Sequence, residues 1–320
     1  MLSRTDLIAA VPDALLRVEL PEFGERHEGK VRDYYVRGQQ RILVTTDRVS
    51  AFDRVVGVVP YKGQVLNQLS AWWFGQLASV VPSHLLCVPD PNVTIAREAK
   101  ALPVEVVVRG HITGSTSTSL WTLYSKGVER PYGLDLPKGL AKNDPLPHPV
   151  VTPTTKAEAG AHDERVTEDE IVSRGLVSAE QWHHVQQVAL SVFEHGRRRA
   201  TSVGLVLVDT KYEFGLIDGN LALIDEVHTP DCSRYWTADG LESARKTGAE
   251  PENYDKEYLR LWFARQGYKG EGPVPSLPDD FVADLAARYI WIYERLTGRG
   301  FEAATRPAGP RIRKALETVL

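Results

Sequence analysis

The sequence predicts an α+β fold, in which strands dominate the first third of the chain and helices dominate its end. Three observations support this prediction. Segments rich in β-branched residues alternate with charged or glycine-containing turns, at residues 41–47, 54–59 and 104–109. Apolar residues recur at helical spacing from Phe281 to Leu296. Between these regions, Asp218-Gly219 separates two apolar runs, which is typical of a β-hairpin.

A helix is expected between the second and third of these strands. Apolar residues recur there at helical spacing: Val65, Leu66, Leu69, Trp73 and Leu77. The spacing predicts a helix over residues 64–79. The adjacent aromatic residues Trp72, Trp73 and Phe74 indicate core packing rather than a cofactor site.

The middle of the chain begins with a stretch that we expect to be irregular. Residues 130–165 carry many prolines, glycines and polar residues without a clear period, and long loops in compact proteins are commonly functional or disordered. Two capping-box patterns follow, Thr167 with Glu170 and Ser178 with Gln181, and each predicts the start of a helix. The second helix is expected to continue to about residue 200.

A hairpin and then helices complete the predicted fold. Residues 204–209 and 211–217 are expected to be strands, and the turn at Asp218-Gly219 leads into a third strand at residues 221–226. The C-terminal part is predicted to be helical, and Gly298 is expected to end the helix that contains Leu296.

Composition and charge exclude several classes of protein. The 320 residues fit two domains or one large one, and the formal net charge of -4 comes without the clustered basic surface that duplex binding needs. The two cysteines, Cys87 and Cys232, are far apart, which excludes a disulfide framework and a cysteine zinc site. No signal peptide and no apolar window of about 20 residues is visible. We therefore expect a soluble, cytoplasmic protein that binds neither nucleic acid nor membrane.

Standard nucleotide-binding motifs are absent, so candidate chemistry comes from four other clusters. Gly29-Lys30 is followed by valine rather than Ser or Thr, and no G-x-G-x-x-G follows a strand. The first cluster is GKVRD at residues 29–33. Its glycine permits close approach of the backbone to a ligand, while Lys30 and Arg32 alternate onto one strand face and can bind phosphate oxygens. The alternative interpretation is a charged, solvated turn.

The second cluster places charged residues in or beside apolar strands: Lys211, Glu213, Asp225 and Glu226. Such residues are rarely buried unless they are paired or bind a metal, and carboxylates facing each other across a hairpin can hold Mg²⁺. A two-residue turn at Asp218-Gly219 pairs Glu213 with Ile224 and leaves Asp225 on the other face, whereas a three-residue loop pairs Glu213 with Asp225. Joint metal binding therefore predicts the longer loop, and a structural salt bridge is the alternative.

The third and fourth clusters lie in polar segments. Residues 108–119 place Arg109 at a strand end before a run of Gly, Ser and Thr that includes Ser115, and such a run can form an anion-binding concavity. A flexible polar loop is the alternative. Residues 152–164, TPTTKAEAGAHDE, contain His162, which is either a general acid or base or a hydrogen-bonded surface histidine.

Taken in order, seven segments resemble the family of phosphoribosylaminoimidazole-succinocarboxamide (SAICAR) synthases. They are GKVRDYY at 29–35, TTDRVSAFD at 45–53, KGQVLNQLSAWWF at 62–74, VVVRGHITGSTSTSLW at 106–121, TPTTKAEAGAHDE at 152–164, LVDTKYEFG at 207–215 and IDEVHTPDCSRYW at 224–236. Each segment alone is weak evidence, but their common order over residues 20–265 is specific. His111 and His228 depart from the family pattern, which has aromatic or aliphatic residues there.

The resemblance implies a fold and a reaction. The expected fold is an ATP-grasp-like arrangement, with a β-rich N-terminal lobe at residues 1–103 that covers the nucleotide and a larger α+β lobe at residues 104–320 that ends in helices. The expected enzyme is an ATP-dependent carbon–nitrogen ligase of purine biosynthesis. It joins carboxyaminoimidazole ribonucleotide (CAIR) to L-aspartate and forms SAICAR, ADP and phosphate, through an acyl phosphate. Such an enzyme is expected to be a monomer or a homodimer, with ATP and Mg²⁺ as its cofactors.

The resemblance also implies roles for individual residues. The ATP phosphates are expected at Gly29, Lys30 and Arg32, and the catalytic centre at Lys211, Glu213 and Asp225, where Lys211 also contacts the nucleotide and the two carboxylates hold Mg²⁺. CAIR is expected at Arg109, Ser115, Asp231 and Arg234. The aspartate side is expected at Ser50 and Asp53, with Lys62 and Asn67 nearby.

Two alternatives stay open on the sequence. One is a related ligase or kinase with a different acceptor, against which the pair of segments TPDCSR and VRGHITGS argues. The other is a nucleotide-binding regulatory protein without catalysis, against which the presence of Lys211, Glu213 and Asp225 argues.

Overall fold

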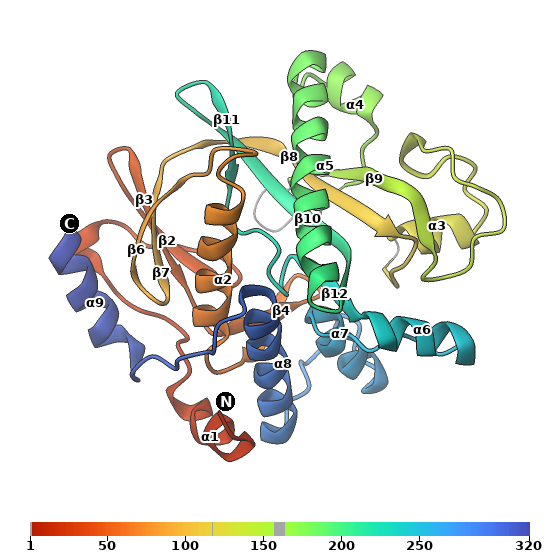
Figure 1. Cartoon of the computed structure of the whole chain (residues 1–320). Coiled ribbons are helices and arrows are strands. Elements are labelled where there is room, and N and C mark those ends of the chain that lie inside the picture. The colour runs from red at the N-terminus through yellow and green to blue at the C-terminus, as the bar shows by residue number, and fades with distance from the viewer. Residues whose placement is uncertain (1, 117, 157–163) are drawn as a thin grey trace.

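The computed structural model describes residues 2–116, 118–156 and 164–320 and shows a mixed fold of antiparallel sheets and helices (Figure 1). His162 and most of its loop therefore lie outside the described residues. Within the described ranges, no helix is both long and apolar enough to cross a membrane.

The first sheet is formed by the N-terminal strands in the order β1-β2-β3-β7-β6. Its strands are β1 (His27–Glu28), β2 (Arg32–Arg37), β3 (Gln40–Thr45), β6 (Leu85–Asp90) and β7 (Val93–Arg97). Buried side chains of this sheet, among them Tyr35 and Ile42, share a hydrophobic core with Ile312 and Leu316 of α9 (Ala308–Val319). Helix α9 therefore covers a sheet made by the first hundred residues (Figure 1).

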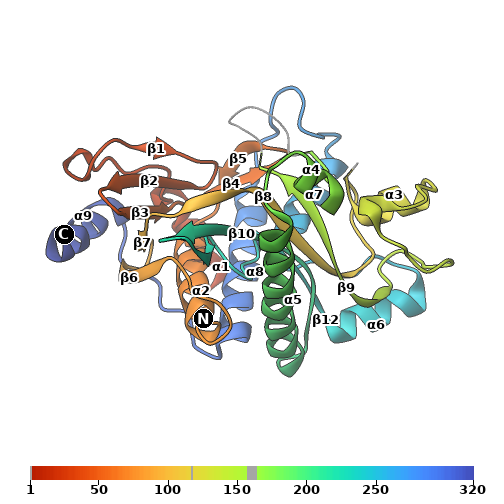
Figure 2. The ribbon, with the colours of Figure 1, turned by 90° about the horizontal axis from the view of Figure 1, so that it is seen from above.

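The second sheet runs in the order β11-β10-β8-β9, and β12 pairs with the first half of β10. Its strands are β8 (Lys100–His111), β9 (Pro145–Thr155), β10 (Leu205–Ile217), β11 (Asn220–Ile224) and β12 (Ser233–Thr237). Helix α5 (Ala179–Ser202) lies against this sheet (Figure 2). A separate hairpin, β4 (Arg48–Ala51) with β5 (Arg54–Val58), forms a two-stranded sheet of its own.

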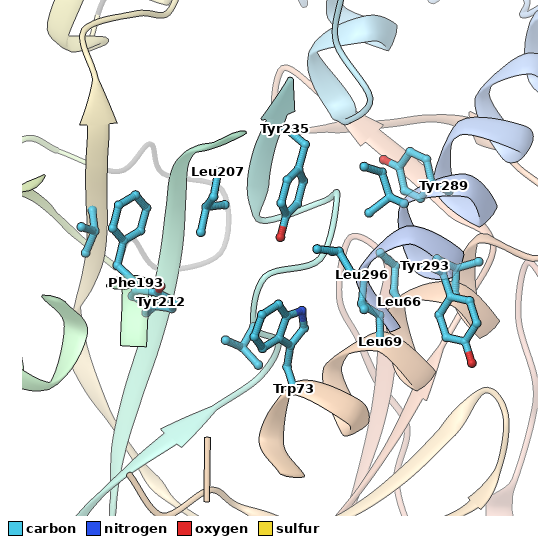
Figure 3. Close-up of a cluster of buried hydrophobic side chains, with 14 of the residues drawn as sticks. Leu66, Leu69, Trp73, Phe193, Leu207, Tyr212, Tyr235, Tyr289, Tyr293 and Leu296 are labelled. Carbon is cyan, nitrogen blue, oxygen red and sulfur yellow. The ribbon is translucent and has the colours of Figure 1, made fainter. Parts of the chain in front are cut away.

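The remaining helices complete the large core and the periphery. They are α1 (Arg4–Ala9), α2 (Lys62–Gln76), α3 (Leu120–Ser125), α4 (Glu168–Ser173), α6 (Ala238–Thr247), α7 (Lys256–Arg265) and α8 (Asp279–Thr297), with 3-10 turns at Val11–Asp13, Pro21–Phe23 and Pro131–Gly133. In the core, α2 and α8 bring Leu66, Leu69, Trp73 and Leu296 together beside Tyr235 of β12 (Figure 3). Burial of these apolar groups stabilises the packing of the two helices against β12, at about 25 cal/mol for each Å² removed from water.

Most of the predicted elements are confirmed. The predicted helix 64–79 is α2, the Thr167–Glu170 pair forms a complete capping box, and Ser178 accepts a hydrogen bond from the backbone N–H of Gln181. Gly298 ends α8 with a φ of 71°, a left-handed conformation in which glycine has no Cβ penalty. The two strands expected over residues 204–217 are one continuous strand, β10.

The expectation that residues 130–165 are irregular throughout is wrong, because β9 lies within them. This strand contains Pro145, Pro147, Pro149 and Pro153, which lack a backbone donor. It is the edge strand of the second sheet, where prolines are tolerated because one side of an edge strand makes no ladder hydrogen bonds. Because of these prolines, the sequence pattern alone does not predict the strand β9.

Candidate active site

A cleft of about 1150 Å³ opens between the first sheet, the β4–β5 hairpin and the polar face of β10. The predicted site residues that line it are Gly29, Lys30, Arg32, Ser50, Asp53, Lys211, Glu213, Asp225, Asp231 and Arg234. Four other predicted residues that the structure describes lie outside this lining: Lys62, Asn67, Arg109 and Ser115. Lys62 and Arg109 pair with the lining carboxylates Asp231 and Asp209, and Ser115 donates to Glu257, a partner of Arg234. Asn67 is buried behind the first sheet, where it donates to the backbone oxygen of Pro91 and accepts from Thr94.

The alternation of side chains along β10 explains why its charged residues face this cleft. Side chains two residues apart on a strand share a face, so Asp209, Lys211 and Glu213 face the cleft while Tyr212 and Phe214 face the core. Lys211 Nζ lies 2.5 Å from Glu105 Oε1, on the paired strand β8, and 3.0 Å from Glu213 Oε1. The β10–β8 register places Glu213 directly opposite Glu105, which is why one ammonium group bridges both.

The hairpin prediction is wrong in its loop length. The turn at Asp218-Gly219 has two residues, so Ile217 pairs with Asn220 and Glu213 pairs with Ile224. Asp225 nevertheless lines the same cleft as Glu213, because β11 ends at Ile224 and Asp225 itself has a left-handed φ of 63°. The strict alternation of side chains no longer applies after the strand ends, so Asp225 need not take the face opposite to Glu213.

The electrostatics of this centre differ between its two predicted metal ligands. Burial opposes ionisation of Glu213, but Lys211 and Lys156 together lower its pKa to about 2. Burial, assisted by the neighbouring carboxylates Glu213 and Glu226, raises the pKa of Asp225 above its ordinary value. Crowded carboxylates of this kind are stabilised by an added cation.

The donor set fits Mg²⁺ in one particular mode. Within residues 2–116, 118–156 and 164–320, no group of three or more His, Cys, Asp or Glu side chains converges tightly enough to hold a metal ion alone. Mg²⁺, however, is usually bound through one or two carboxylates together with substrate phosphates and water. Glu213 and Asp225 are partly exposed oxygen donors that line the same cleft, and they match that requirement.

Residues 29–32 form a tight turn that lines the cleft. The backbone N–H of Gly29 donates to Arg32 O at 2.8 Å, and a Cβ at Gly29 would lie 2.7 Å from that oxygen, so a larger residue would disrupt the turn. Arg32 pairs with Asp225 at 3.1 Å and with Glu226 at 2.9 Å. Lys30 is more exposed and pairs with Asp53 at 2.5 Å. Both cations line the cleft, as predicted, but each has a carboxylate partner.

Arg109 and Arg234 meet at one carboxylate that the sequence does not single out. Arg109 Nη1 lies 3.0 Å and Arg234 Nη1 lies 3.6 Å from Asp209 Oδ2. Arg234 also approaches Glu257 at 3.8 Å, and Ser115 Oγ donates to Glu257 at 3.0 Å. Arg109 and Ser115 thus support Arg234 through Asp209 and Glu257.

A second charged cluster in the cleft is centred on Asp231. The side chain of Asp231 is buried and pairs with Lys62 at 2.8 Å, while Lys256 lies 3.6 Å from it. Burial opposes ionisation of Asp231, but Lys256 and Lys62 hold its pKa well below the ordinary value. Lys256 Nζ also donates to Ser50 Oγ at 2.9 Å, and burial lowers the pKa of Lys256 to about 8. Asp231, expected with CAIR, therefore lies among residues expected for the aspartate side.

Four residues of the site are not singled out by the sequence: Glu105, Asp209, Lys256 and Glu257. Lys156, from the polar segment 152–164 of the sequence analysis, lines the cleft and pairs with Glu213. Asp209 and Glu105 carry a recognisable signal, because each is an acidic residue in a strand of otherwise apolar character. Lys256 carries none, since it begins an amphipathic surface helix in which a lysine is unremarkable.

A cleft of this size, in a mixed α/β fold and lined by both cations and carboxylates, is typical of the enzymes that act on charged small molecules. Comparison with known proteins gives the particular family. The family model for SAICAR synthetase matches residues 25–275. Phosphoribosylaminoimidazole-succinocarboxamide synthase from Legionella pneumophila (strain Lens) is 52% identical over 94% of this chain and 96% of its own length. The chloroplastic enzyme of Arabidopsis thaliana is 48% identical over 93% of this chain and 70% of its own.

Solved structures agree with these sequence comparisons. SAICAR synthase from Saccharomyces cerevisiae, in complex with SAICAR, matches with a TM-score of 0.78 and 31% identity, covering 91% of this chain and 100% of that one. A SAICAR synthetase in complex with ADP matches with a TM-score of 0.66 and 25% identity, over 87% of this chain and 100% of that one. The chain belongs to the SAICAR synthetase family, the ATP-dependent ligases of purine biosynthesis that join CAIR and L-aspartate. The resemblance found in the sequence is therefore confirmed.

Proposed function

We propose that the cleft binds ATP, CAIR and L-aspartate side by side and forms SAICAR through an acyl phosphate. The observation that carries this proposal is the division of the cleft into three charged regions: the Lys211–Glu213–Asp225 centre, the Arg234 region and the Lys256–Ser50 region. A phosphoryl transfer followed by amide formation needs one region for each of its three anionic participants.

The nucleotide is assigned to the side of the cleft formed by the first sheet. Gly29, Lys30 and Arg32 lie there, opposite Lys211, and their donors suit phosphate oxygens. This assignment corresponds to an ATP-grasp-like arrangement, in which residues 1–103 cover the nucleotide and residues 104–320 carry the acceptor. An ADP complex among the structural relatives is consistent with a nucleotide in this fold.

Glu213 and Asp225 are the residues that would hold Mg²⁺. When bound, the ion supplies Lewis-acid stabilisation of charge on the transferring phosphoryl group. Lys211 contributes a fixed positive charge at the same place, and Glu105 and Glu213 hold its ammonium group in position. Burial opposes protonation of Lys211, but Glu213 and Glu105 raise its pKa well above the ordinary value, so the group stays protonated.

The two substrates other than ATP are assigned to the rest of the cleft: CAIR to Arg234, and L-aspartate to the region of Ser50 and Asp53. Arg234 is held by Asp209 and Glu257 with its side chain largely buried, which fixes a planar guanidinium for bidentate binding of an anion. Phosphorylation of the CAIR carboxylate makes phosphate a leaving group. The aspartate amine then attacks the acyl carbon, the C–O bond breaks, and phosphate departs with the original carboxylate oxygen.

Two measurements test this proposal. ADP release is measured with a coupled assay in the presence and absence of CAIR and of L-aspartate, and turnover is expected only with both. CAIR labelled with ¹⁸O in its carboxylate is expected to transfer one labelled oxygen to inorganic phosphate, detected by its effect on the ³¹P resonance. Phosphate without label would exclude the acyl phosphate while leaving the overall reaction intact.

A further inference from the structure

The carboxylate of Asp231 is contacted by polar groups from three helices that are far apart in the sequence. Lys62, the first residue of α2, lies 2.8 Å from Oδ2, and Lys256, the first residue of α7, lies 3.6 Å from the same oxygen. Tyr289, in the middle of α8, donates its hydroxyl to Oδ1 at 2.6 Å. Lys62 and Tyr289 are fully buried, so these contacts are sheltered from water.

These three donors have different relations to the cleft. Asp231 and Lys256 line the cleft, whereas Lys62 and Tyr289 lie behind them in the core. Lys256 is therefore the cation of this cluster that a substrate can meet. Its ammonium group also donates to Ser50 Oγ at 2.9 Å, which brings it to the region assigned to the amino-acid substrate.

Tyr289 and the two lysines contact different oxygens of Asp231. The Tyr289 hydroxyl donates to Oδ1, and both ammonium groups lie nearest to Oδ2. Lys256, at the longer distance, keeps its ammonium group between Asp231 and Ser50. Removing the hydroxyl would deprive the buried acceptor Oδ1 of its donor, which is costly. Lys256 makes the longer contact with Asp231, at 3.6 Å against 2.8 Å for Lys62, so it is the cation that we expect to shift toward Oδ1.

We propose that Tyr289 is a positioning residue for the reaction: by occupying Asp231 Oδ1 it keeps the Lys256 ammonium group at Ser50, where it binds a carboxylate of L-aspartate. The inference rests on the proposed assignment of Ser50 to the aspartate side. Tyr289 lies beyond residues 25–275, the part of the chain that the family model matches. Helix α8 thereby contributes to substrate binding from behind the wall of the cleft.

The direct test is Tyr289→Phe, which removes the hydroxyl and keeps the ring that packs in the core. We expect the KM for L-aspartate to rise about tenfold, the lower end of the loss when a hydrogen bond to a charged group is removed. The KM values for CAIR and ATP are expected to change by about twofold or less. Arg234 and Lys211, the residues assigned to these two substrates, share no hydrogen-bond or ion-pair partner with Tyr289 within the described part of the chain.

A matched control is available one turn further along the same helix. Tyr293 is also largely buried, but its hydroxyl makes no hydrogen bond with any residue in the described ranges. Figure 3 shows the two hydroxyl groups pointing in different directions. Tyr293→Phe is therefore expected to leave all three KM values unchanged, and equal behaviour of the two variants would overturn the inference.

A double-mutant cycle with Lys256→Met separates positioning from a general structural effect. If Tyr289 acts through Lys256, Tyr289→Phe has no further effect on aspartate binding once Lys256 is replaced, whereas independent effects add. Variants too slow for kinetics are compared by the rise in Tm that L-aspartate produces in the presence of CAIR and a non-hydrolysable ATP analogue. Additive losses would refute the positioning role.

Measurements on the wild-type protein distinguish a failure of this inference from a failure of the proposed function. If wild-type ADP release does not depend on CAIR and L-aspartate, the proposed function fails. If it does depend on both, and Tyr289→Phe shifts all three KM values equally, only the inference about Tyr289 fails.

Discussion

Replacing Arg234 with lysine tests the division of the cleft into separate anion sites. Two nitrogens of the Arg234 guanidinium approach two different carboxylates, Asp209 at 3.6 Å and Glu257 at 3.8 Å. A lysine keeps the charge but has a single ammonium group, so it cannot face both carboxylates and still present a planar fork to a ligand.

The expected size of the effect is that of one charge-assisted hydrogen bond. Removing such a bond costs about 1.5–3 kcal/mol, which corresponds to roughly a ten- to hundredfold increase in the KM for CAIR. The KM for L-aspartate is expected to stay nearly constant, because Ser50 and Lys256 share no direct partner with Arg234 among the described residues. Ser50→Ala is expected to show the opposite pattern with a smaller change, since a neutral hydroxyl contributes less than a charged group.

The assay is steady-state ADP release with each substrate varied while the other two are saturating. Arg199→Lys provides a control for the chemical change, because Arg199 donates to the backbone oxygen of Leu296 away from the cleft. Equal increases in both KM values for Arg234→Lys would show that this residue orders the whole site, and the assignment of two anion sites would be wrong.

Three further predictions concern the metal centre, pH and packing. Asp225→Asn is expected to abolish ADP release, because it removes an anionic ligand of Mg²⁺. It removes no side-chain volume from the core, so Tm should hardly change. Normal activity at ordinary magnesium concentrations would contradict the assignment. Burial lowers the pKa of Lys256 to about 8, so its charge is present below that pH and lost above it. The KM for L-aspartate should therefore rise as the pH passes upward through about 8; a constant KM across this range, or the same rise in Lys256→Arg, would argue against this role. Gly196→Ala places a Cβ 2.3 Å from the buried ring of His228 and is expected to lower the free energy of unfolding by about 1–3 kcal/mol. The control is Gly75→Ala, whose Cβ meets no atom within 4 Å, and thermal melts should show it to be neutral or slightly stabilising.

The sequence predicts the local elements better than their connections. Helices with capping residues and the hairpin turn are found because their signals lie within a few residues of each other. The strand β9 is missed, because its prolines are compatible with a strand only at a sheet edge, and the edge position depends on pairing with β8.

For the site, too, the sequence predicts individual residues better than the contacts between them. The cations and carboxylates of the motif segments are predicted, but their partners depend on strand register and on helices distant in the sequence. Asp209 is part of the site because β8 and β12 flank β10 and bring Arg109 and Arg234 to it from both sides. Lys256 and Tyr289 enter through the packing of α7 and α8, which no local pattern encodes. The lobe boundary near residue 103, the oligomeric state and the cytoplasmic location stay predictions.

The packing of α9 on the first sheet has a consequence for the order in which the protein matures. This sheet is synthesised early, yet the core beneath Tyr35 and Ile42 is completed by Ile312 and Leu316 of a helix that follows every other described element. Until α9 has left the ribosome, this core contains only the sheet and N-terminal residues such as Leu15, Leu20 and Phe23. The sheet that covers the proposed nucleotide site cannot close its core before that moment, so firm nucleotide binding is a property of the completed fold. We expect loss of α9 to destabilise the first sheet more than the second, because α9 shares its core with the first sheet.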